Sequence, residues 1–151
     1  MKKISLILIV FIMCTSCGYN AMYSNKNFNF NIIKIEKSKK DKLNLVFERM
    51  INNFSNDQAL NQISLKTNGE KQISVVSKDA RGDPSRYQMI IKLELVIIDD
   101  QKIKKINRNI VQQFSYNNNS NRSKLNQYEK EIEEILINKI IDETIKHISK
   151  F

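Results

Sequence analysis

The chain offers few side chains that could act in catalysis. Its single histidine, His147, stands near the C-terminus, where an imidazole is more often solvated or paired with a helix dipole than a general base. Glu133 and Glu134 are adjacent, and neighbours on a helix do not face each other as an acid–base pair. Three glycines in all cannot build a phosphate-binding loop, and no His, Cys and carboxylate cluster has metal-site spacing. We therefore expect no enzyme activity, no catalytic residue, no metal and no cofactor.

Residues 1–16 have the layout of a secretory signal. Lys2 and Lys3 form a basic start, and residues 4–13 form an uncharged, mainly apolar run of ten. This run is too short to cross about 30 Å of hydrocarbon as a helix. The alternative, a buried N-terminal core helix, leaves the two lysines unexplained. We expect the chain to be exported and residues 1–16 to be removed.

The only two cysteines, Cys14 and Cys17, follow this run. Two cysteines in an exported chain could form a disulfide, but residues 15–18, Thr-Ser-Cys-Gly, are similar to a bacterial lipobox, in which cleavage precedes a cysteine that becomes acylated. Cys17 is the expected lipid attachment site, because cleavage before Cys14 would place the bulky Met13 at the cut. Acyl chains hold a protein at a membrane surface, since each buried CH₂ contributes about 0.8 kcal/mol. Nothing after Cys17 argues for inner-membrane retention, so we expect the outer membrane.

The remaining sequence predicts a tether, residues 17–30, and one domain, residues 31–151. Apolar residues at helical spacing indicate two amphipathic helices, over about 40–54 and 123–149, and Ser38 or Asp41 could cap the first. The apolar positions of the second helix are Leu125, Tyr128, Ile132, Ile135, Leu136, Ile140, Ile141, Ile145 and Ile148. Two such helices need an apolar partner surface, which a sheet can supply.

Four strands are expected, near residues 32–35, 71–79, 86–98 and 103–116. Turns are predicted at Asn68-Gly69, at 81–85, which holds the only proline, and at 99–102. Lys92 and Glu94 alternate with apolar neighbours, so the third strand should have one buried and one solvated face. The last strand is polar-rich and should lie at an edge. These elements predict an α+β two-layer sandwich of β-α-β-β-β-α order, with both helices on one face of a mainly antiparallel four-stranded sheet.

Composition sets limits on the function. The 151 residues suit one domain, and 25 Lys and Arg against 16 Asp and Glu give a net charge of +9. Such an excess can mark a nucleic-acid-binding protein. Because Asn, Lys and Ile are all over-used here, we interpret the charge as a solvated surface and expect no nucleic-acid partner.

Three stretches, in a chain of this element order, resemble the LptE family of lipopolysaccharide (LPS) assembly lipoproteins. They are Cys17-Gly18-Tyr19, Arg86-Tyr87-Gln88-Met89-Ile90-Ile91 and Phe114-Ser115-Tyr116-Asn117. The likeness in layout covers essentially all of the mature sequence. Segment 55–70 matches no motif of the family, and the proline that often follows Tyr19 is absent.

The resemblance implies a scaffold that plugs the LptD β-barrel of the outer membrane, helps the barrel assemble, binds LPS and assists its delivery to the outer leaflet. It also implies LPS contact by basic residues near the turn end of the sheet and near the start of the last helix. Arg81 and Lys124 stand at matching places, and Arg86 is a rival to Arg81 because the alignment across the turn needs a gap. Arginine and lysine suit LPS phosphates. The alternative is that these three are ordinary solvated charges.

Two other functions stay open from the sequence. One is an auxiliary periplasmic lipoprotein of a lipid-trafficking ABC transport system. The other is a small cell-envelope enzyme, which would need catalytic side chains that the sequence does not reveal.

Overall fold

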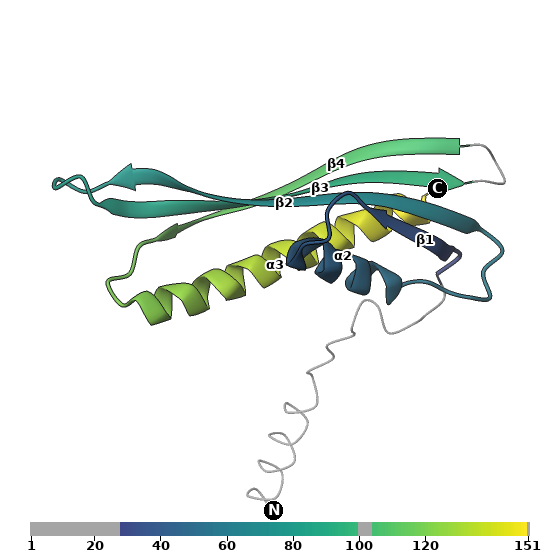
Figure 1. The fold of residues 1–151 in the computed structure, drawn as a ribbon, viewed down its shortest axis with the longest axis horizontal. Helices are drawn as coiled ribbons and strands as arrows, with labels where there is room; N and C mark the ends of the chain where they lie inside the picture. Colours follow the sequence, from purple (N-terminus) through teal and green to yellow (C-terminus); the bar gives the residue numbers. More distant parts are fainter. Residues whose placement is uncertain (1–27, 100–103, 151) are drawn as a thin grey trace, which may run out of the picture.

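The computed structural model describes residues 28–99 and 104–150, and they form the predicted β-α-β-β-β-α order (Figure 1). The elements are β1 (Asn31–Lys37), α2 (Lys42–Asn52), β2 (Gln62–Lys78), β3 (Pro84–Asp99), β4 (Lys104–Asn117) and α3 (Arg122–Ser149). The signal, Cys17, the tether up to residue 27 and residues 100–102 of the last predicted turn lie outside the described residues. In the described end of the tether, Phe30 is already buried in the core.

The sheet has the strand order β1-β2-β3-β4. β1 pairs with β2 in parallel, as a connection through the helix α2 requires, while β2–β3 and β3–β4 are antiparallel. β2 and β3 are long, with 17 and 16 residues, and β1 accompanies only the first part of β2. β4 lies at an edge, which confirms the prediction from its polar sequence.

Both helices lie on one face of the sheet, as Figure 1 shows, and the core fills the space between the two layers. β3 supplies alternate residues to it: Met89, Ile91, Leu93, Leu95 and Ile97. The intervening residues, including Lys92 and Glu94, face away from the helices. No described element covers that other face, which we call the open face. The predicted two-layer α+β sandwich is therefore confirmed.

The predicted turn at Asn68-Gly69 is wrong, because β2 runs straight through it. Gly69 instead allows α2 to pack closely on the sheet. A Cβ atom added there would lie 2.7 Å from Cε2 of Phe47, whose side chain is fully buried. A glycine inside a strand often marks such an approach rather than a turn.

The predicted apolar stripe of α3 is partly wrong. Tyr128 and Ile135 are 43% and 52% exposed, whereas Ile137, which was not in the stripe, is buried. The buried positions move around the helix between Leu125 at its start and Ile148 at its end. A long helix lying across a twisted sheet presents a changing side to it, so one fixed stripe cannot describe the contact.

The start of α2 distinguishes the two proposed caps. The Asp41 carboxylate accepts a hydrogen bond from the Asn44 N–H at 2.9 Å, and this bond lowers the pKa of Asp41. Ser38 instead donates its backbone N–H to the Thr67 carbonyl at 3.0 Å and extends the pairing of β1. Asp41 is therefore the N-cap. Neither described helix combines the length and apolar character needed to cross a membrane.

Candidate functional site

The candidate cations cluster at one end of the molecule, which we call the hairpin end. It comprises the β2–β3 turn (79–83), the end of β4 and the start of α3 (Figure 1). The Asn118 N–H donates to the carbonyl of Ser85 at 2.9 Å, and the Asn118 side chain donates to the carbonyl of Pro84 at 2.8 Å. These bonds join the hairpin to the segment that leads into α3.

Arg81 stands in the turn and is held by acidic neighbours. The Asp79 carboxylate accepts the backbone N–H groups of Arg81 and Asp83 at 2.9 and 3.0 Å, and Gly82 completes the turn with a φ of 88°. The guanidinium lies 3.4 Å from Asp79 and 3.9 Å from Asp83, and the side chain is 82% exposed. Two carboxylates beside one guanidinium reduce its attraction for a further anion.

Arg86 and Lys124 are exposed cations without an ion-pair partner in the described part of the chain. Arg86 lies in β3 between Tyr87, which packs on the core, and the turn, so its side chain faces the open face. Lys124 lies in the first turn of α3 and donates its backbone N–H to the Asn121 side chain at 3.1 Å. The structure thus brings both to the hairpin end, but on the two different layers.

A tyrosine cluster fixes the start of α3 beneath the sheet. Tyr87 and Tyr116 are register partners on β3 and β4, and their rings stack with centroids 5.7 Å apart. Tyr128 of α3 meets Tyr116 edge-on at 6.1 Å. The Tyr116 hydroxyl donates to Glu129 at 2.7 Å, and burial together with this carboxylate raises the pKa of Tyr116. Two of the three stretches that carry the family resemblance, those at 86–91 and 114–117, are therefore neighbours in the sheet.

The remaining chemical candidates do not assemble into a site. His147 lies 3.8 Å from Glu143 in the last turns of α3. Glu133 is paired with Lys71 of β2 at 2.8 Å. In the part of the chain that the structure describes, no group of His, Cys, Asp and Glu could hold a metal ion.

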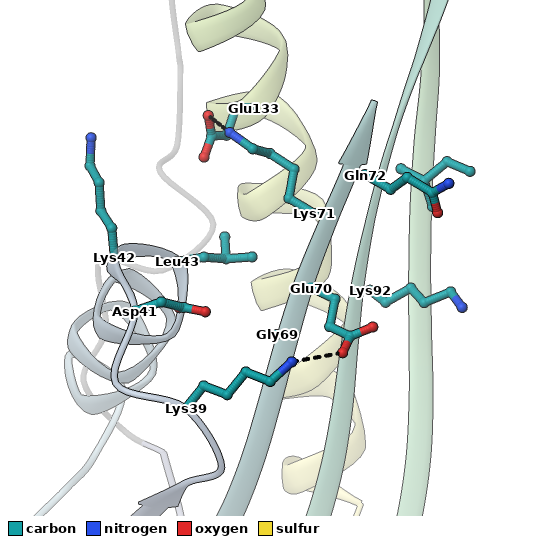
Figure 2. Close-up of a pocket in the computed structure, with 11 residues that line it drawn as sticks. Lys39, Asp41, Lys42, Leu43, Gly69, Glu70, Lys71, Gln72, Lys92 and Glu133 are labelled. Atoms are coloured by element: carbon teal, nitrogen blue, oxygen red, sulfur yellow. Dashed lines mark hydrogen bonds and ion pairs between the residues drawn. The ribbon is translucent and has the colours of Figure 1, made fainter. Parts of the chain in front are cut away.

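A groove that the sequence did not predict lies beside the outer edge of β2. It has a volume of about 570 Å³ and is bounded by the start of α2, the edge of β2 around Gly69 and the side of α3 at Glu133 (Figure 2). The only sequence signals were a glycine within a strand and Asn44, a polar residue among the apolar positions of α2. Asn44 is fully buried and contacts Gly69.

The comparisons with known proteins find similar structures but no similar sequence. No family model matches this chain, and no curated protein matches it in sequence. Solved structures do match. Rare lipoprotein B from Shewanella oneidensis has a TM-score of 0.56 at 17% identity, covering 79% of this chain and 94% of that one. A minor lipoprotein from Acinetobacter baumannii has a TM-score of 0.56 at 15% identity, covering 82% and 94%.

This chain has the fold of these bacterial lipoproteins. A lipoprotein B from Nitrosomonas europaea matches as well, with a TM-score of 0.53 at 10% identity over 81% of this chain and 83% of that one. The fold expected for a lipoprotein of the LptE type is thus present in the described residues. At such identities the likeness concerns the fold alone.

Proposed function

We propose that this chain is a lipid-anchored outer-membrane protein that plugs and helps assemble an LptD-like β-barrel and assists LPS delivery to the outer leaflet. The observation that carries the proposal is the shared fold with rare lipoprotein B over nearly all of that protein. In this proposal the lipobox-like residues 15–18 direct lipid attachment to Cys17, and the attached lipid holds the protein at the membrane. The paired Tyr87 and Tyr116 stretches add residue-level support.

A scaffold role suits the two layers of the domain. One face of the sheet is closed by both helices, while the open face carries alternating charged, amide and aliphatic residues. The long pairing of β2 with β3, from Ser64↔Ile98 to Lys78↔Pro84, makes this face a stiff ribbon. A stiff, mainly polar surface can lie against the polar interior of a barrel without exposing the core. We therefore propose a non-enzymatic function without a cofactor.

LPS recognition is proposed for the hairpin end, with Arg86 and Lys124 as the principal cations. LPS carries phosphates, and charge-assisted hydrogen bonds to phosphate are the strong ones. Arg81 contributes less in this proposal, because Asp79 and Asp83 already surround it. The first turn of α3 contains no acidic residue, so its helix dipole also favours a bound anion there.

The experiment is LPS binding by the full-length lipoprotein in detergent, with charge reversal at the hairpin end. Arg86→Glu/Lys124→Glu should weaken binding by about tenfold or more, since one hydrogen bond to a charged group contributes about 1.5–3 kcal/mol. Arg81→Glu/Lys124→Glu should weaken it less. Lys105→Glu/Lys139→Glu makes the same change in net charge away from this end and should bind LPS normally. Equal losses in the first and last double variants would mean that only net charge matters.

A further inference from the structure

The outer edge of β2 is paired along only part of its length. The parallel pairing with β1 ends at Lys37↔Thr67, but β2 continues to Lys78. Figure 1 shows β2 running on past β1 toward the hairpin end. From Asn68 onward, no described strand lies on this side of β2.

Printed hydrogen bonds establish which backbone groups face that edge. The carbonyl of Thr67 accepts from the Ser38 N–H, and both backbone groups of Gly69 are bound by Asn44, at 2.7 Å for the N–H and 3.2 Å for the carbonyl. In a strand the direction of these groups alternates with each residue. Lys71, Ile73 and Val75 therefore present their N–H and C=O groups to the same edge, where no described residue bonds to them.

Asn44 shows that this edge accepts a peptide-like group. Its side-chain amide both accepts from the N–H and donates to the carbonyl of Gly69, as the next residue of a neighbouring strand would do. The side chain is fully buried and is fixed by a third bond, 2.9 Å long, in which its amide N–H donates to Asp41. The edge is thus paired by β1, then by one amide, and beyond that amide by no residue that the structure describes; we call this last stretch the vacant edge.

The side chains along the vacant edge are uncharged and partly apolar, although they are exposed. From Gln72 to Ser77 no residue is charged, and Ile73, Val75 and Val76 are 41–52% exposed. Ile73 and Val75 are on the side of the helix layer, because their register partners are Met89 and Tyr87. α2 begins beside Gly69 and runs away from the hairpin end (Figure 1). An extended, unprotected edge of this kind pairs readily with another strand.

The charged residues of the groove indicate which kind of segment would bind at this edge. The carboxylates of the groove are engaged, since Glu70 and Glu133 pair with lysines at 3.3 and 2.8 Å and Asp41 caps α2. Lys42 and Lys92 also line the groove and have no ion-pair partner among residues 28–99 and 104–150. The excess charge is positive, so a segment with carboxylates is favoured.

We propose that Lys71–Val75 is a strand-addition site, at which an extended acidic segment of a partner protein pairs with β2. Backbone bonds to the three outward-facing residues would hold the segment. Its alternate side chains would cover Ile73 and Val75 on the helix side, and the carboxylates between them would lie on the open face, the side of Lys92. The site needs neither LPS binding nor the barrel, so it can fail or succeed independently of the function proposed above.

Amide hydrogen exchange, measured by NMR on the full-length lipoprotein in detergent, tests the site. The probe is a blocked peptide of alternating Val and Glu, and the matched control peptide has Lys in place of Glu. At about ten times its Kd, the acidic peptide should slow exchange at Lys71, Ile73 and Val75 about tenfold. Gln72 and Ser74, which already bond to β3, should change little. The basic peptide should have no effect.

Three variants sharpen the test. Ile73→Pro removes the central outward N–H and should abolish protection. Gln113→Pro, on the outer edge of β4 in the neighbouring cross-strand row of Gln72 and Ile90, should leave it intact. Lys92→Glu leaves the backbone untouched and should shift the preference to the basic peptide.

Three results would overturn the proposal. The first is the absence of protection by the acidic peptide, and the second is equal protection by both peptides. The third is protection that grows with the concentration of the protein alone, which would assign this edge to a second copy of the chain.

Discussion

Gly69→Ala should destabilise the domain, because α2 packs closely on β2 at this glycine. The added Cβ would lie 2.7 and 2.8 Å from two ring carbons of Phe47 and 3.2 Å from the Asn44 side-chain oxygen. The Phe47 side chain is fully buried, and in a close-packed interior a displaced ring must displace its neighbours in turn. The substitution must therefore push α2 away from the sheet or force Phe47 out of its preferred rotamer.

The expected cost follows from these distances. Overpacking a core by one methyl group costs about 1–3 kcal/mol, and replacing glycine by alanine regains about 0.4–1 kcal/mol from the unfolded chain. The net loss should be about 1–2 kcal/mol. With a urea m-value of about 1–3 kcal/mol/M, the unfolding midpoint, followed by circular dichroism, should fall by roughly 1 M.

Two comparisons isolate the cause. In a Phe47→Leu background the smaller side chain removes the clash, so the cost of Gly69→Ala should shrink. Gly82→Ala is the matched control, because its φ is 88° and nothing lies within 4 Å of the added Cβ. It should cost about 1–2 kcal/mol for backbone reasons alone, in either background. A wild-type midpoint for Gly69→Ala, or a cost unchanged by Phe47→Leu, would refute the close-approach argument.

Further predictions concern the anchor and two titratable groups. Cys17→Ala should abolish acyl labelling, and persistent labelling would assign the lipid to Cys14. Tyr116→Phe should lower the free energy of unfolding by about 1 kcal/mol. Because the pKa of Tyr116 is raised in the fold, the stability advantage of the wild type should be complete below pH about 10 and shrink above it. A stability difference that stays constant across pH 8–11 (roughly the titration range of tyrosine) would count against the Glu129 bond. Lys34 and Lys66 lower the pKa of Glu36 to about 2, so its contribution to stability should be present above pH 4.5 and be lost toward pH 2; an NMR titration midpoint near 4.5 at low salt would contradict these ion pairs.

Much of the fold follows from local patterns. The alternation around Lys92 and Glu94 predicts a strand with one buried face, because side chains on a strand alternate between faces. The helical spacing of apolar residues predicts α2 and α3, and it also predicts that each helix packs one side against the sheet. The element order and the two-layer arrangement are confirmed on this basis.

The errors come from contacts between distant elements. Asn68-Gly69 has turn residues, and only the approach of Phe47 explains a glycine inside a strand. The exposure of Ile135 on α3 depends on the twist of the sheet, which the helix sequence does not encode. Such features need the partner surface before they can be predicted.

In the candidate site, too, some features could be predicted from the sequence and others could not. The family resemblance leads to the hairpin end, and the acidic neighbours of Arg81 can be seen in the sequence. The vacant edge of β2 cannot, because it depends on β1 stopping at Lys37 while β2 continues to Lys78. A difference in length between paired strands is a property of the sheet.

The central proposal is that this chain occupies a barrel in the outer membrane. Its most direct test is purification of the tagged full-length lipoprotein from solubilised membranes of its own cell, with its partners identified by mass spectrometry. The account predicts a large outer-membrane β-barrel in stoichiometric amount, with LPS in the complex. An inner-membrane ABC transporter in its place, or a chain found free in the cytosol with residues 1–16 still attached, would contradict it.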